Sequence, residues 1–143
     1  MSDYRNLLKP DIPEPRAIAF ISGAMSGGTP EEVRLNINAA RHIQKLLTLK
    51  GYHCYCPHSN SFGLDRLIDA PTEFFYKGDL LLLPHCDIVV MVPGWELSKG
   101  ARDEYDEAYR LGCIIYKHIE DVPPADTIDL GAQCGGGTHH VRG

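Results

Sequence analysis

The acidic residue Glu104 differs from the other acids of its segment in where its side chain should point. It lies in an expected helix that ends near Gly112 and follows the apolar run 88–92 and a break at Pro93-Gly94. Four residues should form the stripe of this helix that faces the interior: Ala101, Tyr105, Ala108 and Gly112. Four others point away from it: Asp103, Asp106, Glu107 and Arg110. Glu104 projects about 60° from the centre of the stripe, so we expect it to be held against protein, where a nucleophile or general base would lie.

The loop before this helix is placed to meet a ligand. A buried strand that breaks at Pro-Gly and leads into a helix through small residues is where open α/β sheets bind ligands. Ser98 is the expected N-cap of the helix, and Gly100 follows in its first turn. The cap has a structural role by itself, and a functional role would add contact of its hydroxyl, or of the amides behind it, with a ligand phosphate. Trp95 is expected either to stack on a base or simply to pack.

A second candidate loop, residues 22–28, joins the apolar strand 17–22 to a helix that begins at Thr29-Pro30. Thr29 can cap this helix, Pro30 suits its first position, and Glu32 can complete a capping box. Glycines let a backbone approach a ligand, and free amides at a helix start favour an anion. The loop has neither the P-loop nor the dinucleotide-binding pattern, so a plain tight connection is the alternative. Its candidate binding residues are Ser22, Gly23, Met25, Ser26 and Gly27.

Other polar and aromatic residues lie outside these two loops. Asp79 is in the middle of an expected helix over residues 71–83, where aspartate is locally unfavourable. From the sequence alone we expect its carboxylate to be exposed to solvent, as most charged side chains are. Asn60 and Phe62, in the loop after the second strand, are expected to shape a base pocket together with Trp95.

The elements that must position these residues alternate along the chain. Four short segments are expected strands: residues 17–22, 53–56, 87–92 and 114–117. Three longer segments are expected helices: residues 30–50, 71–83 and 98–112. This alternation predicts an α/β fold, in which helices cover both faces of a mostly parallel sheet of four or five strands. We expect a single flavodoxin-like or Rossmann-like three-layer domain over residues 17–130, after an arm at 1–16 and before a flexible tail at 131–143.

Composition and charge exclude several classes of protein. The chain has 143 residues, enough for one domain with a sizeable core, and a formal net charge of −5. No Lys/Arg cluster is dense enough to bind a nucleic-acid polymer, and no segment reads as a membrane span or a signal peptide. The five cysteines are expected to be reduced thiols in a cytoplasm. Four residues fit no standard zinc spacing, so we expect neither metal nor cofactor: His53, Cys54, Cys56 and His58.

Three features make the chain similar to the nucleoside 2-deoxyribosyltransferase superfamily, close to its deoxynucleoside 5′-monophosphate N-glycosidases and its small, often phage-borne relatives. They are the segment 20–28, the aspartates Asp79 and Asp87, and the pattern Ser98-x-Gly100-x-x-x-Glu104-x-x-x-Ala108. Together they span about residues 17–117. If the chain is phage-encoded, the expected location is the host cytoplasm.

The resemblance implies a role for each matching residue. It makes Glu104 the nucleophile that attacks the anomeric carbon, and Asp79 the group that assists departure of the base. It makes Ser98 a contact of the 5′-phosphate and lays the glycine loop against sugar and phosphate. Phe20 stands where many members have a tyrosine whose hydroxyl orients the nucleophile, so that support is missing or comes from elsewhere. The resemblance also implies a homodimer or larger oligomer with a shared active site. Residues 126–130 are a candidate for the segment that one subunit contributes to the active site of another.

The expected activity is therefore cleavage of the N-glycosidic bond of a (deoxy)nucleoside 5′-monophosphate through a covalent glycosyl-glutamate, by hydrolysis rather than transfer. A deoxyribosyltransferase acting on free nucleosides and a glycohydrolase acting on ribonucleotides or nicotinamide dinucleotides are alternatives. A catalytically idle nucleotide-binding or sensor module is another. Burial beside Tyr105 and Ala108 would raise the pKa of Glu104, whereas the positive end of the helix would lower it, and the sequence leaves both outcomes open.

Overall fold

Five parallel strands form the single sheet of the computed structural model, which describes residues 11–25, 28–61, 64, 67–129 and 140–142. The strands are β1 (Ala17–Ser22), β2 (Tyr52–Tyr55), β3 (Ile88–Met91), β4 (Ile114–Tyr116) and β5 (His140–Arg142). Their order in the sheet is β2-β1-β3-β4-β5, and each neighbouring pair is parallel. This order is that of flavodoxin-like folds, so the predicted α/β class with a parallel sheet is confirmed.

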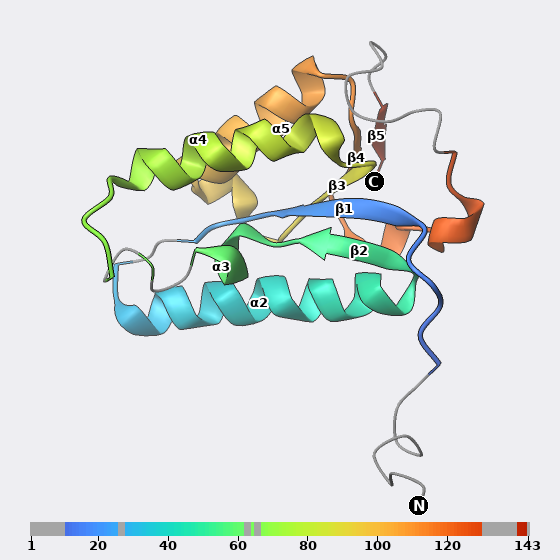
Figure 1. Ribbon diagram of the computed structural model, residues 1–143, viewed down its shortest axis with the longest axis horizontal. Helices are drawn as coiled ribbons and strands as arrows, with labels where there is room; N and C mark the ends of the chain where they lie inside the picture. Colours follow the sequence, from blue (N-terminus) through green and yellow to red (C-terminus); the bar gives the residue numbers. More distant parts are fainter. Residues whose placement is uncertain (1–10, 26–27, 62–63, 65–66, 130–139, 143) are drawn as a thin grey trace, which may run out of the picture.

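Helices cover both faces of this sheet (Figure 1). On one side lie α2 (Pro30–Leu49) and the short α3 (Pro57–Asn60), and on the other lie α4 (Thr72–Leu82) and α5 (Lys99–Arg110). Short 3-10 segments connect these elements, among them η2 (Leu83–His85), η3 (Trp95–Leu97), η4 (Ile119–Asp121) and η5 (Ala125–Thr127). The arrangement is the expected three-layer one.

The start of α2 follows directly from its sequence. The Thr29 hydroxyl accepts a hydrogen bond from the Glu32 amide (3.1 Å), and the Gly28 amide donates to the Glu32 carboxylate (2.6 Å). Pro30 occupies the first helical position, where its missing N–H costs nothing. The predicted helix start is confirmed, although the carboxylate of the box bonds Gly28, one residue before the N-cap.

Side-chain alternation along β1 divides the core into two parts. Ala17, Ala19 and Ile21 pack in the cluster that includes residues of α2. Phe20 belongs to the other cluster, together with Ala108 of α5 and residues of β3 and β4. Because successive strand residues point to opposite faces, the side chain that follows at the end of β1 points toward α4 and α5.

The structure differs from the sequence expectations at the C-terminal tail and at one cysteine. β5 lies within the segment expected to be a tail, where it pairs with β4, and residues 131–139 and 143 lie outside the described residues.

Cys54, Cys56 and Cys86 are free thiols, but Cys113 is disulfide-bonded, so the expectation of reduced thiols is wrong at that position. Among the helices of the described residues, none has the length and apolar character that a membrane span requires.

Candidate active site

Ser22 and Glu104 meet at the carboxyl edge of the sheet. Ser22 ends β1, is fully buried, and lies on the face that α5 covers. Its hydroxyl donates a hydrogen bond to Oε1 of Glu104, with a distance of 2.6 Å between the oxygens. Only 6% of Glu104 is exposed, so the burial expected from the helical projection is confirmed. The hydroxyl that orients this carboxyl group therefore comes from Ser22, two residues after Phe20, which has none.

Burial raises the pKa of Glu104 to about 8, because the charged carboxylate loses its hydration inside the protein. The hydrogen bond from Ser22 acts in the opposite direction, and the negative charges of Asp79 and Asp103 add to the rise. Of the two opposing effects that the sequence suggested, burial dominates. The neutral acid is consequently the main form of Glu104 at neutral pH.

Asp79 is half-buried on α4, so the expectation of a solvent-exposed carboxylate is wrong. The hydroxyl of Tyr55, at the end of β2, donates a hydrogen bond to Oδ1 of Asp79 (2.7 Å). Desolvation raises the pKa of Asp79, and this hydrogen bond lowers it. Only folding brings β2, which carries Tyr55, next to α4. The sequence of α4 alone therefore did not reveal that Asp79 is half-buried.

The start of α5 lies beside this pair of carboxyl groups. Ser98 caps the helix, as expected, by accepting a hydrogen bond from the Ala101 amide (3.2 Å). Gly100 follows in the first turn, where an added Cβ would lie 3.9 Å from the Ser98 hydroxyl oxygen. Trp95, in η3, stacks on Tyr105 with ring centroids 4.7 Å apart and an interplanar angle of 17°. Packing of Trp95 is thus confirmed, and its contact with a base stays a prediction.

The glycine loop after β1 is anchored where it leaves the sheet. Gly23 is buried against Val92, which follows β3. His58 is 1% exposed, and its Nε2 lies 2.7 Å from the Ala24 carbonyl oxygen; because a carbonyl only accepts, Nε2 carries the hydrogen. Burial lowers the pKa of His58, which keeps the ring neutral. Met25 is half-buried, and the three other candidates, Ser26, Gly27 and Phe62, lie outside the described residues.

Replacement of Gly23 by alanine should destabilise the protein. The added Cβ would lie 2.6 Å from Cβ and 2.7 Å from Cγ2 of buried Val92, so backbone must move. We expect the Gly23→Ala variant to lose about 1–3 kcal/mol of unfolding free energy, measured by denaturant titration. Gly28→Ala in the same loop is the control, because Gly28 is exposed and its added Cβ would meet only the Glu32 carboxylate oxygen at 3.4 Å, so we expect a change within about 0.5 kcal/mol. Equal stability of Gly23→Ala and the parent protein would show that the loop is not held against Val92.

The two aspartates of the resemblance separate in the fold. Asp79 lies near Glu104, but Asp87 lies at the opposite, amino end of the strands, just before β3. Oδ2 of Asp87 accepts a hydrogen bond from the Ile18 amide (2.7 Å), and its own amide donates to the Ile18 carbonyl (2.8 Å). Asp87 therefore joins β1 to β3 and takes no part in the candidate site.

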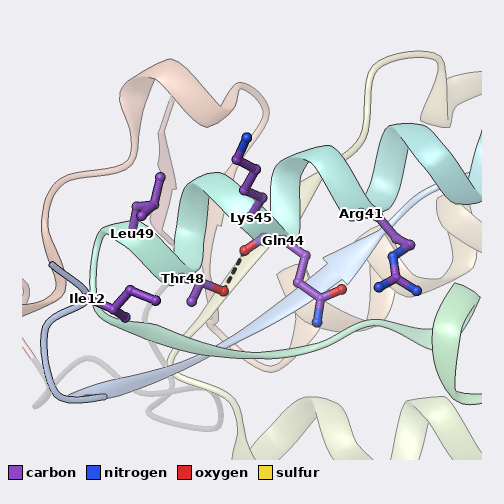
Figure 2. Close-up of a pocket in the computed structure, with 6 residues that line it drawn as sticks. All are labelled: Ile12, Arg41, Gln44, Lys45, Thr48 and Leu49. Carbon is purple, nitrogen blue, oxygen red and sulfur yellow. Dashed lines mark hydrogen bonds between the residues drawn. The ribbon is translucent and has the colours of Figure 1, made fainter. Parts of the chain in front are cut away.

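Two surface hollows in the described part of the chain lie away from these carboxyl groups. The one in Figure 2, of about 350 Å³, lies on α2 and is lined by Ile12, Arg41, Gln44, Lys45, Thr48 and Leu49. The other, of about 380 Å³, lies where residues 13–16 meet Gly51 and Pro124. Neither is lined by a buried ionisable side chain, so we base the candidate site on Glu104. Within the described ranges, no group of three or more His, Cys, Asp or Glu is placed to hold a metal ion.

Residues 17–117 match a protein family described as a domain of unknown function (DUF4406). The chain belongs to this family. The match runs from the start of β1 to the residue after β4, and it includes Ser22, Asp79, Ser98 and Glu104. Comparison with curated proteins finds no match, and comparison with solved structures finds none either.

Sequence reasoning gave no role in this site to three residues: Tyr55, which bonds Asp79, His58, which bonds the glycine loop, and Tyr76, which bonds Asp103 beside Glu104. Strand alternation was a partial signal for Tyr55, because it places this side chain on the opposite face of the strand from Cys54. Its neighbour Phe20 is known only from the register of β2 with β1. Burial and a hydrogen bond with Asp103 raise the pKa of Tyr76 to about 12, so Tyr76 links α4 to α5. No sequence signal marks His58, because its carbonyl partner lies in a distant loop.

Proposed function

We propose that this protein cleaves the N-glycosidic bond of a deoxynucleoside 5′-monophosphate through a covalent glycosyl-glutamate intermediate, with hydrolysis as the overall reaction. The observation that carries the proposal is the buried carboxyl group of Glu104, which Ser22 holds at 2.6 Å at the carboxyl edge of the sheet. A second carboxyl group, that of Asp79, is near enough for its charge to raise the pKa of Glu104. Pairs of carboxyl groups in distinct environments are the usual means of cleaving glycosidic bonds.

In the proposed first step, a carboxylate oxygen of Glu104 attacks C1′ of the sugar and forms an ester while the C1′–N bond breaks. The electron pair of that bond goes to the departing base, which takes a proton from the carboxyl group of Asp79. In the second step, water attacks C1′, its proton passes to the Asp79 carboxylate, and the Glu104 carboxylate departs. The products are the free base and deoxyribose 5-phosphate, and the reaction requires neither oxidant nor reductant.

The start of α5 supports a monophosphate as the substrate. Helix geometry leaves the amides of the first turn, at Lys99 and Gly100, without a carbonyl partner inside the helix. The positive end of the helix dipole there favours an anion. The resemblance assigns the phosphate contact to Ser98, which lies at this same point. The glycine loop, with Gly23 beside Val92, leaves the sheet at the same edge.

A screen of common nucleotides tests this proposal. Deoxynucleoside 5′-monophosphates, the matching deoxynucleosides and ribonucleoside 5′-monophosphates are incubated with the protein, and free base is measured by chromatography. We expect base release from at least one deoxynucleoside monophosphate, and slower release from the matching nucleoside. Added acceptor base identifies a deoxyribosyltransferase, because transfer yields a new nucleoside. Nucleotide binding in calorimetry without any base release would identify a binding module instead and would overturn the proposal.

We further propose a homodimer that forms through α4, in line with the oligomer that the resemblance implies. Phe74 and Leu81 are 64% and 75% exposed, and no residue of α4 is buried. They lie two turns apart and so share one side of the helix. Apolar side chains that form a contiguous exposed patch mark interaction surfaces. Because α4 also carries Asp79, a second copy packed on it would lie next to the candidate site.

If the dimer forms through α4, a charged residue introduced on this helix should break it. We expect the parent protein to have the mass of a dimer in light scattering, and Leu81→Lys to have that of a monomer at the same concentration. Leu35→Lys is the control, because Leu35 is 61% exposed on α2, at the other face of the sheet, and should leave the dimer intact. A monomeric parent protein would refute the dimer, and a dimeric Leu81→Lys variant would refute its placement on α4.

A further inference from the structure

The hydroxyl group of Tyr55 lies between two polar side chains that come from different elements. It donates a hydrogen bond to Oδ1 of Asp79, on α4, over 2.7 Å. It accepts one from the side-chain amide of Asn60, at the end of α3, over 3.2 Å. Asn60, which the sequence suggested as part of a base pocket, thus bonds a neighbouring side chain. The three residues form a short chain of hydrogen bonds that ends on the proposed acid.

The direction of this chain is fixed by the chemistry of its members. Burial and the nearby charges of Asp79 and Glu104 raise the pKa of Tyr55 well above its ordinary value, so the phenol stays neutral. A neutral phenol has one hydrogen to donate, and a carboxylate can only accept it. The amide of Asn60 fills a lone pair of the phenol oxygen, and a phenol that accepts a hydrogen bond becomes a better donor. Asn60 therefore strengthens the bond from Tyr55 to Asp79.

The ring of Tyr55 has a separate structural role. It packs against Phe20 of β1, with ring centroids 5.5 Å apart and an interplanar angle of 38°. This contact keeps the end of β2 beside the end of β1, where Ser22 holds Glu104. A phenylalanine at position 55 would preserve the ring contact and remove only the hydroxyl. Packing and hydrogen bonding of Tyr55 can therefore be tested independently.

We propose that Tyr55, supported by Asn60, is the positioning residue for Asp79: its hydroxyl holds Oδ1 and leaves Oδ2 to face the substrate. Among the described residues, no hydrogen bond to Oδ2 competes with this role. The inference rests on the proposed function, in which Asp79 delivers a proton to the departing base. In this proposal Tyr55 acts through Asp79, which its hydroxyl bonds, and not through contact with the sugar or the base.

The consequence is a defined change in the titration of Asp79. Tyr55 from β2 and Glu104 from α5 are the ionisable groups that face it, and Tyr76 on its own helix is bonded to Asp103. The hydrogen bond from Tyr55 stabilises the charged form of Asp79, so its loss should raise the pKa of Asp79. A residue with a purely structural role would leave this titration unchanged.

The Tyr55→Phe variant tests the proposal. We expect kcat to fall by about tenfold with KM nearly unchanged, and the acid limb of the pH–rate profile to move to higher pH. Carbon NMR of aspartate-labelled protein should show the Asp79 carboxyl group titrating at higher pH in Tyr55→Phe. Tyr52→Phe is the matched control, because Tyr52 also lies on β2 and donates its hydroxyl to the Pro123 carbonyl (2.8 Å), in the core cluster of the other sheet face. In the Tyr52→Phe control, the NMR titration of Asp79 and the acid limb of the pH–rate profile should both stay unchanged.

The two readouts separate this inference from the proposed reaction. If Asp79 titrates at higher pH in Tyr55→Phe but no substrate releases base, the positioning role stands and the proposed reaction fails. If base is released but Tyr55→Phe leaves both the Asp79 titration and the acid limb where they are in the parent protein, the positioning role is overturned.

Discussion

In the Glu104→Gln variant we expect base release to fall by about a thousandfold or more, while the folded protein becomes more stable at alkaline pH. Glutamine has nearly the same size as glutamate, and its carbonyl oxygen can accept the hydrogen bond that Ser22 donates. Its amide, however, cannot form the ester with C1′. The variant should therefore bind nucleotide and fail to turn it over.

The gain in stability follows from the pKa of Glu104, which burial raises from 4.5 to about 8 in the folded protein. Between these values the folded protein keeps a proton that the unfolded chain has already released, so stability falls as pH rises through this window. Each pH unit in it costs about 1.4 kcal/mol of unfolding free energy. Glutamine does not titrate, so at pH 9 we expect Glu104→Gln to be more stable by on the order of 4 kcal/mol, with the difference shrinking toward pH 5.

Denaturant titrations at pH 5 and pH 9 and the base-release assay measure the two effects of Glu104→Gln. Glu107→Gln is the matched control, because Glu107 lies on the same helix but is paired at the surface with Arg110, which lowers its pKa. It should retain base release and gain no stability at pH 9. Base release by Glu104→Gln at the parent rate would remove Glu104 from the mechanism.

The pH dependence of kcat/KM should show an alkaline limb near pH 8. The ligand-free site holds its proton on Glu104, whereas the reactive form has the proton on Asp79 and the charge on Glu104. Both forms carry the same number of protons, so activity should stay level while the pair holds one proton. Above about pH 8 that proton is lost, no acid is left for the departing base, and kcat/KM should fall about tenfold per pH unit.

Initial rates from pH 5 to pH 10 at constant ionic strength measure this profile, and circular dichroism at each pH verifies that the protein stays folded. Loss of activity at low pH is also expected, because protonation of both carboxyl groups removes the nucleophile. A rate that rises through pH 8 and stays high would show that Glu104 must be ionised but that Asp79 does not act as the acid.

Most of the architecture of this protein could be predicted, because short local sequence patterns indicate its main helices and strands. The apolar run of β3 and the Thr29-Pro30 start of α2 each fixed an element before any contact was known. The alternation of strands and helices then left a parallel sheet as the natural arrangement. The burial of Glu104 was equally predictable, since helical periodicity alone decides which side of α5 a residue occupies.

The pairings inside the site were decided only by the tertiary structure. Ser22 and Glu104 are separated by 82 positions and Tyr55 and Asp79 by 24, and no local pattern relates residues so far apart. Asp79 shows the limit most clearly: its helix gave no reason to expect burial, and only the approach of β2 supplied the hydroxyl that bonds it. The chain by itself thus indicated four of the five strands, the three longer helices and the buried side of α5, but not β5, α3 or the half-buried acid of α4. The packing of those elements determined which polar groups meet, because burial leaves them no water to bond instead.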